Sequence, residues 1–225
     1  KDLRANAGKS LVVAGFEQPL AVHVLAYAIN ETLGNIGKTV VFNEAPQEKF
    51  GGIEALAKDL VSGAVEALVI VGGNPVYDAP ADLNWEAAQK KAKTVIRWGY
   101  YEGDETGSTA NYHFPATHYL ESWGDARAFD GSLVPVQPLI APLFDGITEL
   151  EFLARLGGFN ETNSYEIVRS TFGKLSNGGE EAWKKFLHEG FLAGSEPNPA
   201  SVILNSGAVS KALSASQPST APSRD

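Results

Sequence analysis

The chain has 225 residues, a net charge of −9 at pH 7 and no cysteine. This length is enough for one large α/β domain, or for one domain with an appendage. The acidic balance and the lack of a Lys/Arg cluster argue against a nucleic-acid-binding protein. The lack of cysteine excludes disulfides, thiolate-held iron–sulfur clusters and a cysteine nucleophile within this chain.

Methionine is also absent, so we expect the chain to be a piece of a longer protein. No signal peptide is visible, and no apolar run approaches the ~20 residues that a membrane-spanning helix needs. An exported parent protein could carry its signal sequence before Lys1.

The first hundred residues alternate between predicted strands and helices. Apolar runs rich in β-branched residues predict strands at 10–14, 39–43, 67–71 and 94–98. Helical spacing of apolar residues predicts helices at 19–33, 52–62 and 83–92. This order, with its short connections, predicts an α/β fold with a doubly wound, mainly parallel, Rossmann-like sheet.

Residues 104–146 form a long segment with little helical or strand periodicity, which makes it a candidate functional loop. Helices are predicted after it at 147–156, 165–175 and 180–189, with a short strand at 202–204. We therefore expect a Rossmann-like domain at 1–158 that includes the loop at 104–146, a helical C-terminal extension at 159–205 and a linker-like tail at 206–225.

Ligands of doubly wound sheets bind beyond the carboxyl ends of the strands. Gly72, Gly73 and Asn74 follow the third predicted strand, where two glycines would let a ligand approach the backbone and Asn74 could bond a base or ribose. A plain tight turn needs the same residue types and is the favoured interpretation. Gly15 follows the first predicted strand, but one glycine beside Glu17 is not a nicotinamide-dinucleotide fingerprint.

The long loop carries polar residues that allow two further interpretations. His113 and His118 could bind a metal ion in a shell completed by neighbouring Glu121 and Asp125, although histidines hydrogen-bonded within a packed loop are favoured over ligands. Four carboxylates could form an acid/base pair, or they could cap short helices and hold turns, and the sequence leaves both interpretations open. These are Asp104, Glu105, Asp125 and Asp130.

Three motifs resemble one family. HFPATHYLESWGDARAFDGSLVPVQPLIAPLFDG, at 113–146, resembles the matching stretch of the Tat-variant-translocated molybdopterin oxidoreductases, which include the large iron–sulfur subunit of bacterial alternative complex III and its relatives. LGNIGK, at 33–38, resembles a turn widespread in molybdopterin oxidoreductases. LVIVGGNP, at 68–75, resembles the strand and turn that approach the guanine-dinucleotide arm of the cofactor in catalytic members. The likeness spans roughly residues 11–158.

The resemblance implies a role in a membrane-bound respiratory complex that passes electrons from quinol to a periplasmic acceptor. The molybdopterin-like part of the iron–sulfur subunit in that complex is understood to be a scaffold without molybdenum cofactor, and the iron–sulfur clusters would lie elsewhere in the parent protein. We therefore expect no catalytic residue and no cofactor in this chain. Its expected partners are the rest of the parent chain and other subunits on the periplasmic side of the bacterial inner membrane.

An alternative interpretation is that the chain belongs to an active oxidoreductase and binds its cofactor. In an active oxidoreductase, Gly15, Gly72, Gly73 and Asn74 would contact molybdopterin guanine dinucleotide. A third possibility is a metal-dependent hydrolase that uses His113, His118 and Asp125.

Overall fold

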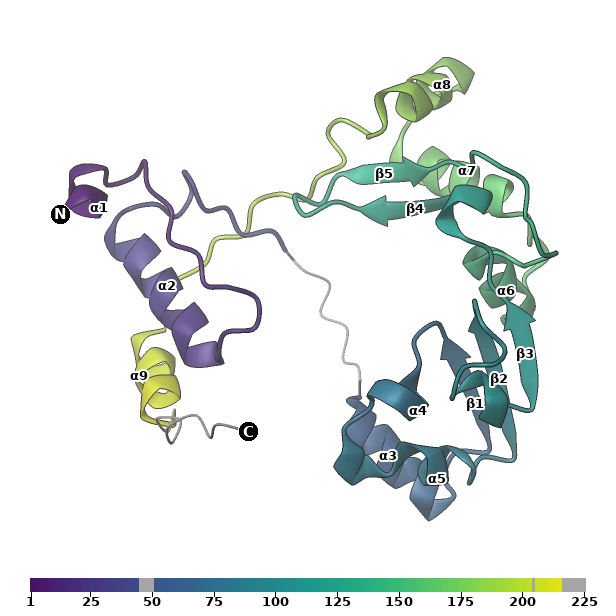
Figure 1. Ribbon diagram of the computed structural model, residues 1–225. Helices are drawn as coiled ribbons and strands as arrows, with labels where there is room; N and C mark the ends of the chain where they lie inside the picture. Colours follow the sequence, from purple (N-terminus) through teal and green to yellow (C-terminus); the bar gives the residue numbers. More distant parts are fainter. Residues whose placement is uncertain (45–50, 204, 216–225) are drawn as a thin grey trace. The chain divides into compact units, whose positions relative to one another are not determined.

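The computed structural model describes residues 1–44, 51–203 and 205–215. The chain divides into two compact units, of which the first combines Lys1–Pro46 with Pro197–Asp225 and the second is Gln47–Glu196. The helices of the first unit are α1 (Asp2–Ala5), α2 (Leu20–Thr32) and α9 (Ser206–Ala215), which Figure 1 labels. None of the helices in the described part of the chain is long and apolar enough to span a membrane.

In the first unit, the helix predicted at 19–33 is confirmed as α2, but both predicted strands are wrong. Residues 10–14 and 39–43 form no strand, and only isolated bridges occur there, such as Ile36 with Val40. The side chain of Asn30 explains the first case. It accepts from the amide of Val12 at 3.0 Å and donates to the carbonyl of Val12 at 2.7 Å. These are the backbone groups that a neighbouring strand would otherwise bind.

The tail prediction is also wrong for its first half, because residues 206–215 form α9, which packs against α2. Val209 and Leu213 recur four residues apart, which places both on one helical face. Small Ser and Ala residues do not stop a helix, so a composition poor in large apolar residues does not by itself indicate a linker. Val202 and Ile203 form no strand. Residues 204 and 216–225 lie outside the described residues.

The second unit contains a three-stranded parallel sheet in the order β1–β2–β3. The strands are β1 (Ala67–Val71), β2 (Thr94–Gly99) and β3 (Tyr112–Pro115). β1 and β2 confirm predicted strands, whereas β3 lies inside the segment expected to be irregular. The chain is thus a mixed helix–strand protein of α/β character.

Helices lie on both faces of this sheet. On one face, Leu68, Ile70 and Val95 pack with α3 (Ile53–Ser62) and α5 (Trp85–Gln89). The helix predicted at 52–62 is confirmed as α3, while α5 is shorter than its predicted 83–92. On the other face, Trp98 and Phe114 contact Phe152 of α6 (Glu149–Leu156), with ring centroids 6.4 and 5.6 Å apart. A short helix, α4 (Pro75–Asp78), follows β1.

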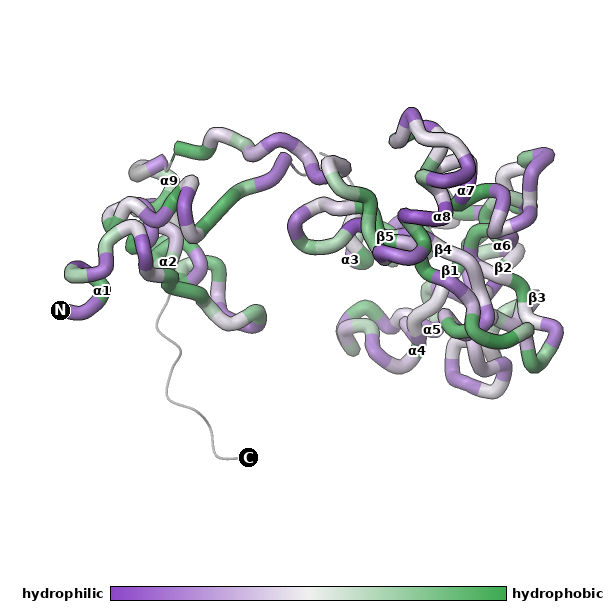
Figure 2. The backbone as a smooth tube through the Cα atoms, turned by 90° about the horizontal axis from the view of Figure 1, so that it is seen from above, coloured by the Kyte–Doolittle hydropathy of each residue, from purple (hydrophilic) through white to green (hydrophobic). Residues whose placement is uncertain are grey.

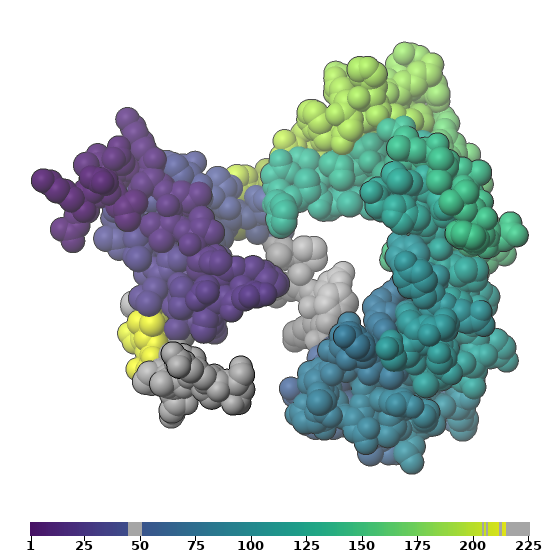
Figure 3. All heavy atoms as spheres, viewed as in Figure 1, coloured from purple at the N-terminus to yellow at the C-terminus, as the bar shows by residue number. Residues whose placement is uncertain are grey.

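A second sheet pairs β4 (Gly124–Arg127) with β5 (Leu133–Val136) in antiparallel fashion. It packs against α7 (Ser164–Leu175) and α8 (Glu180–Glu189), and these segments lie side by side in Figures 1 and 3. Their shared core contains Leu133, Val168, Phe172, Trp183 and Phe186. The helices predicted at 147–156, 165–175 and 180–189 are confirmed. Figure 2 shows hydrophilic and hydrophobic residues mixed along α7 and α8, as expected for helices with one buried face.

Candidate functional site

The carboxyl ends of β1 and β2 border a cavity of about 220 Å³. The predicted residues Gly72 and Gly73 line it. The other lining residues come from β2 and the segments after β2 and β3: Arg97, Trp98, Gly99, Tyr100, Tyr101, Asp104 and Ala116. The structure therefore places a cavity at the edge of the sheet where the sequence predicts a ligand site.

The two glycines have a conformational reason to be glycine. Gly72 and Gly73 have φ values of 67° and 68°, in the left-handed region that side chains with a Cβ rarely adopt. The amide of Gly72 donates to the carbonyl of Trp98 at 2.9 Å, which ties the turn to β2. These contacts favour the tight-turn interpretation of the motif.

The side chain of Asn74 is engaged within the protein. Its Oδ1 accepts from the amide and the hydroxyl of Thr106, at 3.1 and 2.7 Å. Its Nδ2 donates to Oε2 of Glu105 at 2.7 Å, and this hydrogen bond lowers the pKa of Glu105. Asn74 thus joins the turn after β1 to residues 105–106 after β2, and its amide is already used for the hydrogen bonds that a base or ribose would need.

Arg97 is a residue of this site that the sequence analysis missed. Its side chain is only 3% exposed, and its Nη2 forms an ion pair with Oδ2 of Asp104. Asp104 also accepts from the amide of Gly107 at 2.7 Å. Within the described residues, Nε and Nη1 of Arg97 have no hydrogen-bond partner. The only signal in the sequence is an arginine inside the apolar run TVIRW.

The remaining predicted residues are not gathered around this cavity. Gly15 belongs to the first unit, where its carbonyl accepts from the amide of Gln18 at 3.0 Å. His113 lies on β3, and its Nδ1 is buried without a partner among the described residues. Nδ1 of His118 accepts from the amide of Leu120 at 3.3 Å, and Asp125 lies on β4. No group of three or more His, Asp or Glu residues in the described ranges could hold a metal ion.

Three of the four carboxylates considered for acid/base chemistry have structural hydrogen bonds. Asp104 binds Arg97, and Glu105 binds Asn74. Asp130 accepts from the amide of Ser132 at 2.9 Å in the turn between β4 and β5, and this backbone hydrogen bond lowers its pKa. For Asp125, partial burial raises the pKa against a smaller lowering effect of Arg127. The environment of Asp125 therefore disfavours its charged form.

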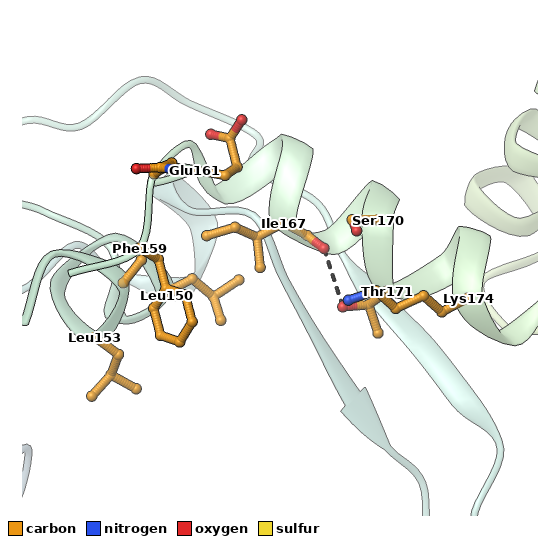
Figure 4. A pocket seen from close by; sticks show the side chains of 10 residues that line it. Leu150, Leu153, Phe159, Glu161, Ile167, Ser170, Thr171 and Lys174 are labelled. Carbon is orange, nitrogen blue, oxygen red and sulfur yellow. Dashed lines mark hydrogen bonds between the residues drawn. The ribbon is translucent and has the colours of Figure 1, made fainter. Parts of the chain in front are cut away.

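A larger cavity of about 370 Å³ lies between α6 and α7 (Figure 4). Leu150, Leu153, Phe159 and Ile167 supply apolar walls, and Thr171 donates to the carbonyl of Ile167 at 3.1 Å. None of the predicted site residues lines it. We therefore place the candidate site at the carboxyl edge of the parallel sheet.

No protein-family model matches the chain, and no curated protein matches its sequence.

Proposed function

We propose that this chain is a cofactor-free structural domain of an iron–sulfur subunit similar to molybdopterin oxidoreductases. The subunit would belong to a respiratory complex that transfers electrons from quinol to a periplasmic acceptor, with its iron–sulfur clusters outside this chain. Its partners would be the rest of the parent protein and neighbouring subunits on the periplasmic side of the inner membrane. The support comes from the residues at the carboxyl edge of the sheet.

The internal hydrogen bonds of Asn74 carry the proposal. Both of its amide atoms are bound to Thr106 and Glu105, so recognition of a guanosine would require these bonds to break. Leaving the buried amide and hydroxyl of Thr106 unpaired costs about 1–3 kcal/mol each. The carboxylate of Glu105 beside Asn74 would also repel a phosphate group.

The size of the cavity agrees with this interpretation. Pockets for drug-sized ligands and cofactors have volumes of roughly 300–1,000 Å³, whereas this one has about 220 Å³. A pterin dinucleotide is larger than most such ligands, so it would need the loops after β1 and β2 to separate. The bonds between Asn74 and Thr106 oppose that separation.

The doubly wound, Rossmann-like sheet is part of the same proposal. Three parallel strands and helices on both faces of the sheet support it. The connection from β1 to its parallel neighbour β2 runs through α5, as in the βαβ units from which such sheets are built.

Exposed apolar residues support a role in protein contacts. Leu139, Leu143 and Phe144 are exposed in the segment between β5 and α6, and Phe129 is fully exposed between β4 and β5. Clusters of exposed apolar side chains commonly mark protein–protein contacts. Trp123, between these two segments and β3, is not part of this exposed set and packs against the core of α7 and α8.

Isothermal titration with GDP tests the proposal against the active-oxidoreductase alternative. We expect no heat of binding at millimolar GDP, because Asn74 is occupied. The alternative is supported by the two glycines after β1, which leave space beside the backbone for a ligand. It predicts saturable GDP binding that Asn74→Ala abolishes. The control Asn160→Ala, at an exposed position, should leave this binding unchanged. Saturable binding with that pattern would contradict the proposal.

A further inference from the structure

A third cavity, of about 260 Å³, has a chemistry that the proposed function does not use. It lies beyond β2 and beside β4, and Trp98 and Tyr100 border both this cavity and the smaller one. Its lining residues are Trp98, Tyr100, Thr117, Tyr119, Ser122, Trp123, Gly124, Asp125, Val136, Glu149 and Leu150. The lining contains four aromatic side chains and two carboxylates, and it contains no Lys or Arg.

Neither carboxylate is neutralised within the described part of the molecule. Asp125 is half-buried on β4, and Glu149 is exposed in the first turn of α6. Arg127, on the same strand as Asp125, donates from Nη1 to the carbonyls of Gly131 and Ser195, at 2.7 Å each, and forms no ion pair with Asp125 among the described residues. Partial burial raises the pKa of Asp125 against a smaller lowering effect of Arg127, so the folded protein disfavours its charged form.

A polar group in the wall is also unsatisfied. Thr117 is 3% exposed, and its Oγ1 is buried without a hydrogen-bond partner in the described residues. Buried hydroxyl groups normally have a partner in the protein, in water or in a ligand. The cavity therefore combines unpaired negative charge with an unused hydrogen-bonding group.

The aromatic walls decide which kind of cation fits. Ring faces attract cations, and rings that surround a cavity bind ammonium groups with alkyl substituents better than strongly hydrated metal ions. A metal site would need three or more His, Asp or Glu side chains, and this cavity has only two carboxylates. The described residues contain no group of that kind. From this arrangement we propose that the cavity between Trp98, Trp123, Asp125 and Glu149 binds the head group of an organic cation, an alkylammonium or a guanidinium.

Choline and its neutral isostere 3,3-dimethyl-1-butanol provide the test with the intact chain. In a ¹⁵N-correlated spectrum, choline should shift the indole resonances of Trp98 and Trp123 in a saturable manner. The indoles of Trp85 and Trp183 lie outside the cavity lining and should stay unchanged. The neutral alcohol should bind at least roughly tenfold more weakly, because it lacks the charge that the carboxylates and rings attract.

Paired variants separate this site from a general effect of negative charge. Asp125→Asn with Glu149→Gln should weaken choline binding by roughly tenfold or more. Glu54→Gln with Asp59→Asn removes the same charge from exposed positions on α3 and should leave it unchanged. Far-UV circular dichroism would verify that both pairs are folded, and Tyr119→Leu serves as a second cavity variant if the first pair is not.

Two further probes distinguish the sources of the cation. N-acetyl-lysine methylamide and N-acetyl-arginine methylamide represent a basic side chain of a partner polypeptide, whereas choline and n-butylammonium represent free amines. Tighter binding of the blocked amino acids would identify a partner polypeptide as the source of the cation, and tighter binding of the free amines would identify a small molecule. Either result supports the proposed cation site. Either of two results would overturn the inference. One is equal affinity for choline and its neutral isostere. The other is no indole shift with any of the four cations at 50-fold excess over about 1 mM protein.

Discussion

The guanidinium group of Arg97 lies against Gly99, so that a Cβ atom on Gly99 would be 2.8 Å from Nε of Arg97. The two residues are two positions apart on β2 and therefore share one face of the sheet. Gly99 thus provides the space in which the buried arginine lies. The arginine in turn holds Asp104, which begins the segment that closes the carboxyl edge of the sheet.

Gly99→Ala should displace Arg97 and lower the free energy of unfolding by about 1–3 kcal/mol, the usual cost of overpacking. Urea denaturation followed by tryptophan fluorescence measures this change. Gly103→Ala is the matched control, because a Cβ there meets nothing within 4 Å. If both variants have the same stability, the close packing of Arg97 on Gly99 has no energetic weight.

The Arg97–Asp104 pair should be strongly non-additive. Asp104→Leu leaves a buried guanidinium without its counter-ion, and removing one partner of a buried pair costs about 3–5 kcal/mol. Arg97→Leu together with Asp104→Leu removes both charges and should cost less than the sum of the single variants. The exposed pair Lys93–Glu66 is the comparison, and Glu66→Gln should change stability by less than about 1 kcal/mol. Additive effects at Arg97 and Asp104 would show that the two side chains do not interact.

Asn74 should stabilise the closed arrangement of the loops after β1 and β2. Asn74→Ala removes the acceptor of two Thr106 hydrogen bonds and the donor to Glu105, so we expect a loss of about 1–3 kcal/mol. Amide hydrogen exchange of Thr106 should also accelerate, because its amide loses its acceptor. The exposed Asn160→Ala provides the control. Unchanged exchange at Thr106 would contradict this role of Asn74.

Asp125 should destabilise the fold at neutral pH. Burial raises its pKa in the folded state above the usual value of 3.8, so the folded protein binds more protons than the unfolded chain between these two pKa values. Stability contributed by this group is therefore lost as pH rises through that window. Asp125→Asn should raise the thermal midpoint at pH 7, and the gain should shrink as pH falls toward 3.8. A gain that is independent of pH would exclude titration of Asp125 as its cause.

The sequence predicted the elements whose pattern is local. The continuous run ALVIV became β1, and α7, which has Asn163 as its N-cap in the structure, starts within one residue of its predicted start. β3 was missed because Tyr112–Pro115 is short and becomes a strand only through its pairing with β2. The strand at 10–14 was wrong because Asn30, eighteen residues after Val12, binds the backbone there.

The candidate site was predictable in position but not in detail. The rule that ligands bind beyond the carboxyl ends of parallel strands points to Gly72 and Gly73, and both residues line a cavity at that edge. It could not show that Asn74 is bonded to Thr106, because that contact spans 32 positions along the chain. Nor could it separate Asp104, which pairs with the buried Arg97, from Asp125, whose pKa is raised by partial burial.

In our proposal, the carboxyl edge of the sheet is closed by the protein's own side chains and serves as a scaffold without a cofactor. The most direct measurement is elemental and pterin analysis of the purified parent protein, with molybdenum and tungsten quantified by mass spectrometry and pterin by fluorescence after oxidation. We expect neither metal nor pterin in stoichiometric amount, while iron from clusters outside this chain is present. One molybdenum or tungsten atom with its pterin per parent chain would contradict the proposal.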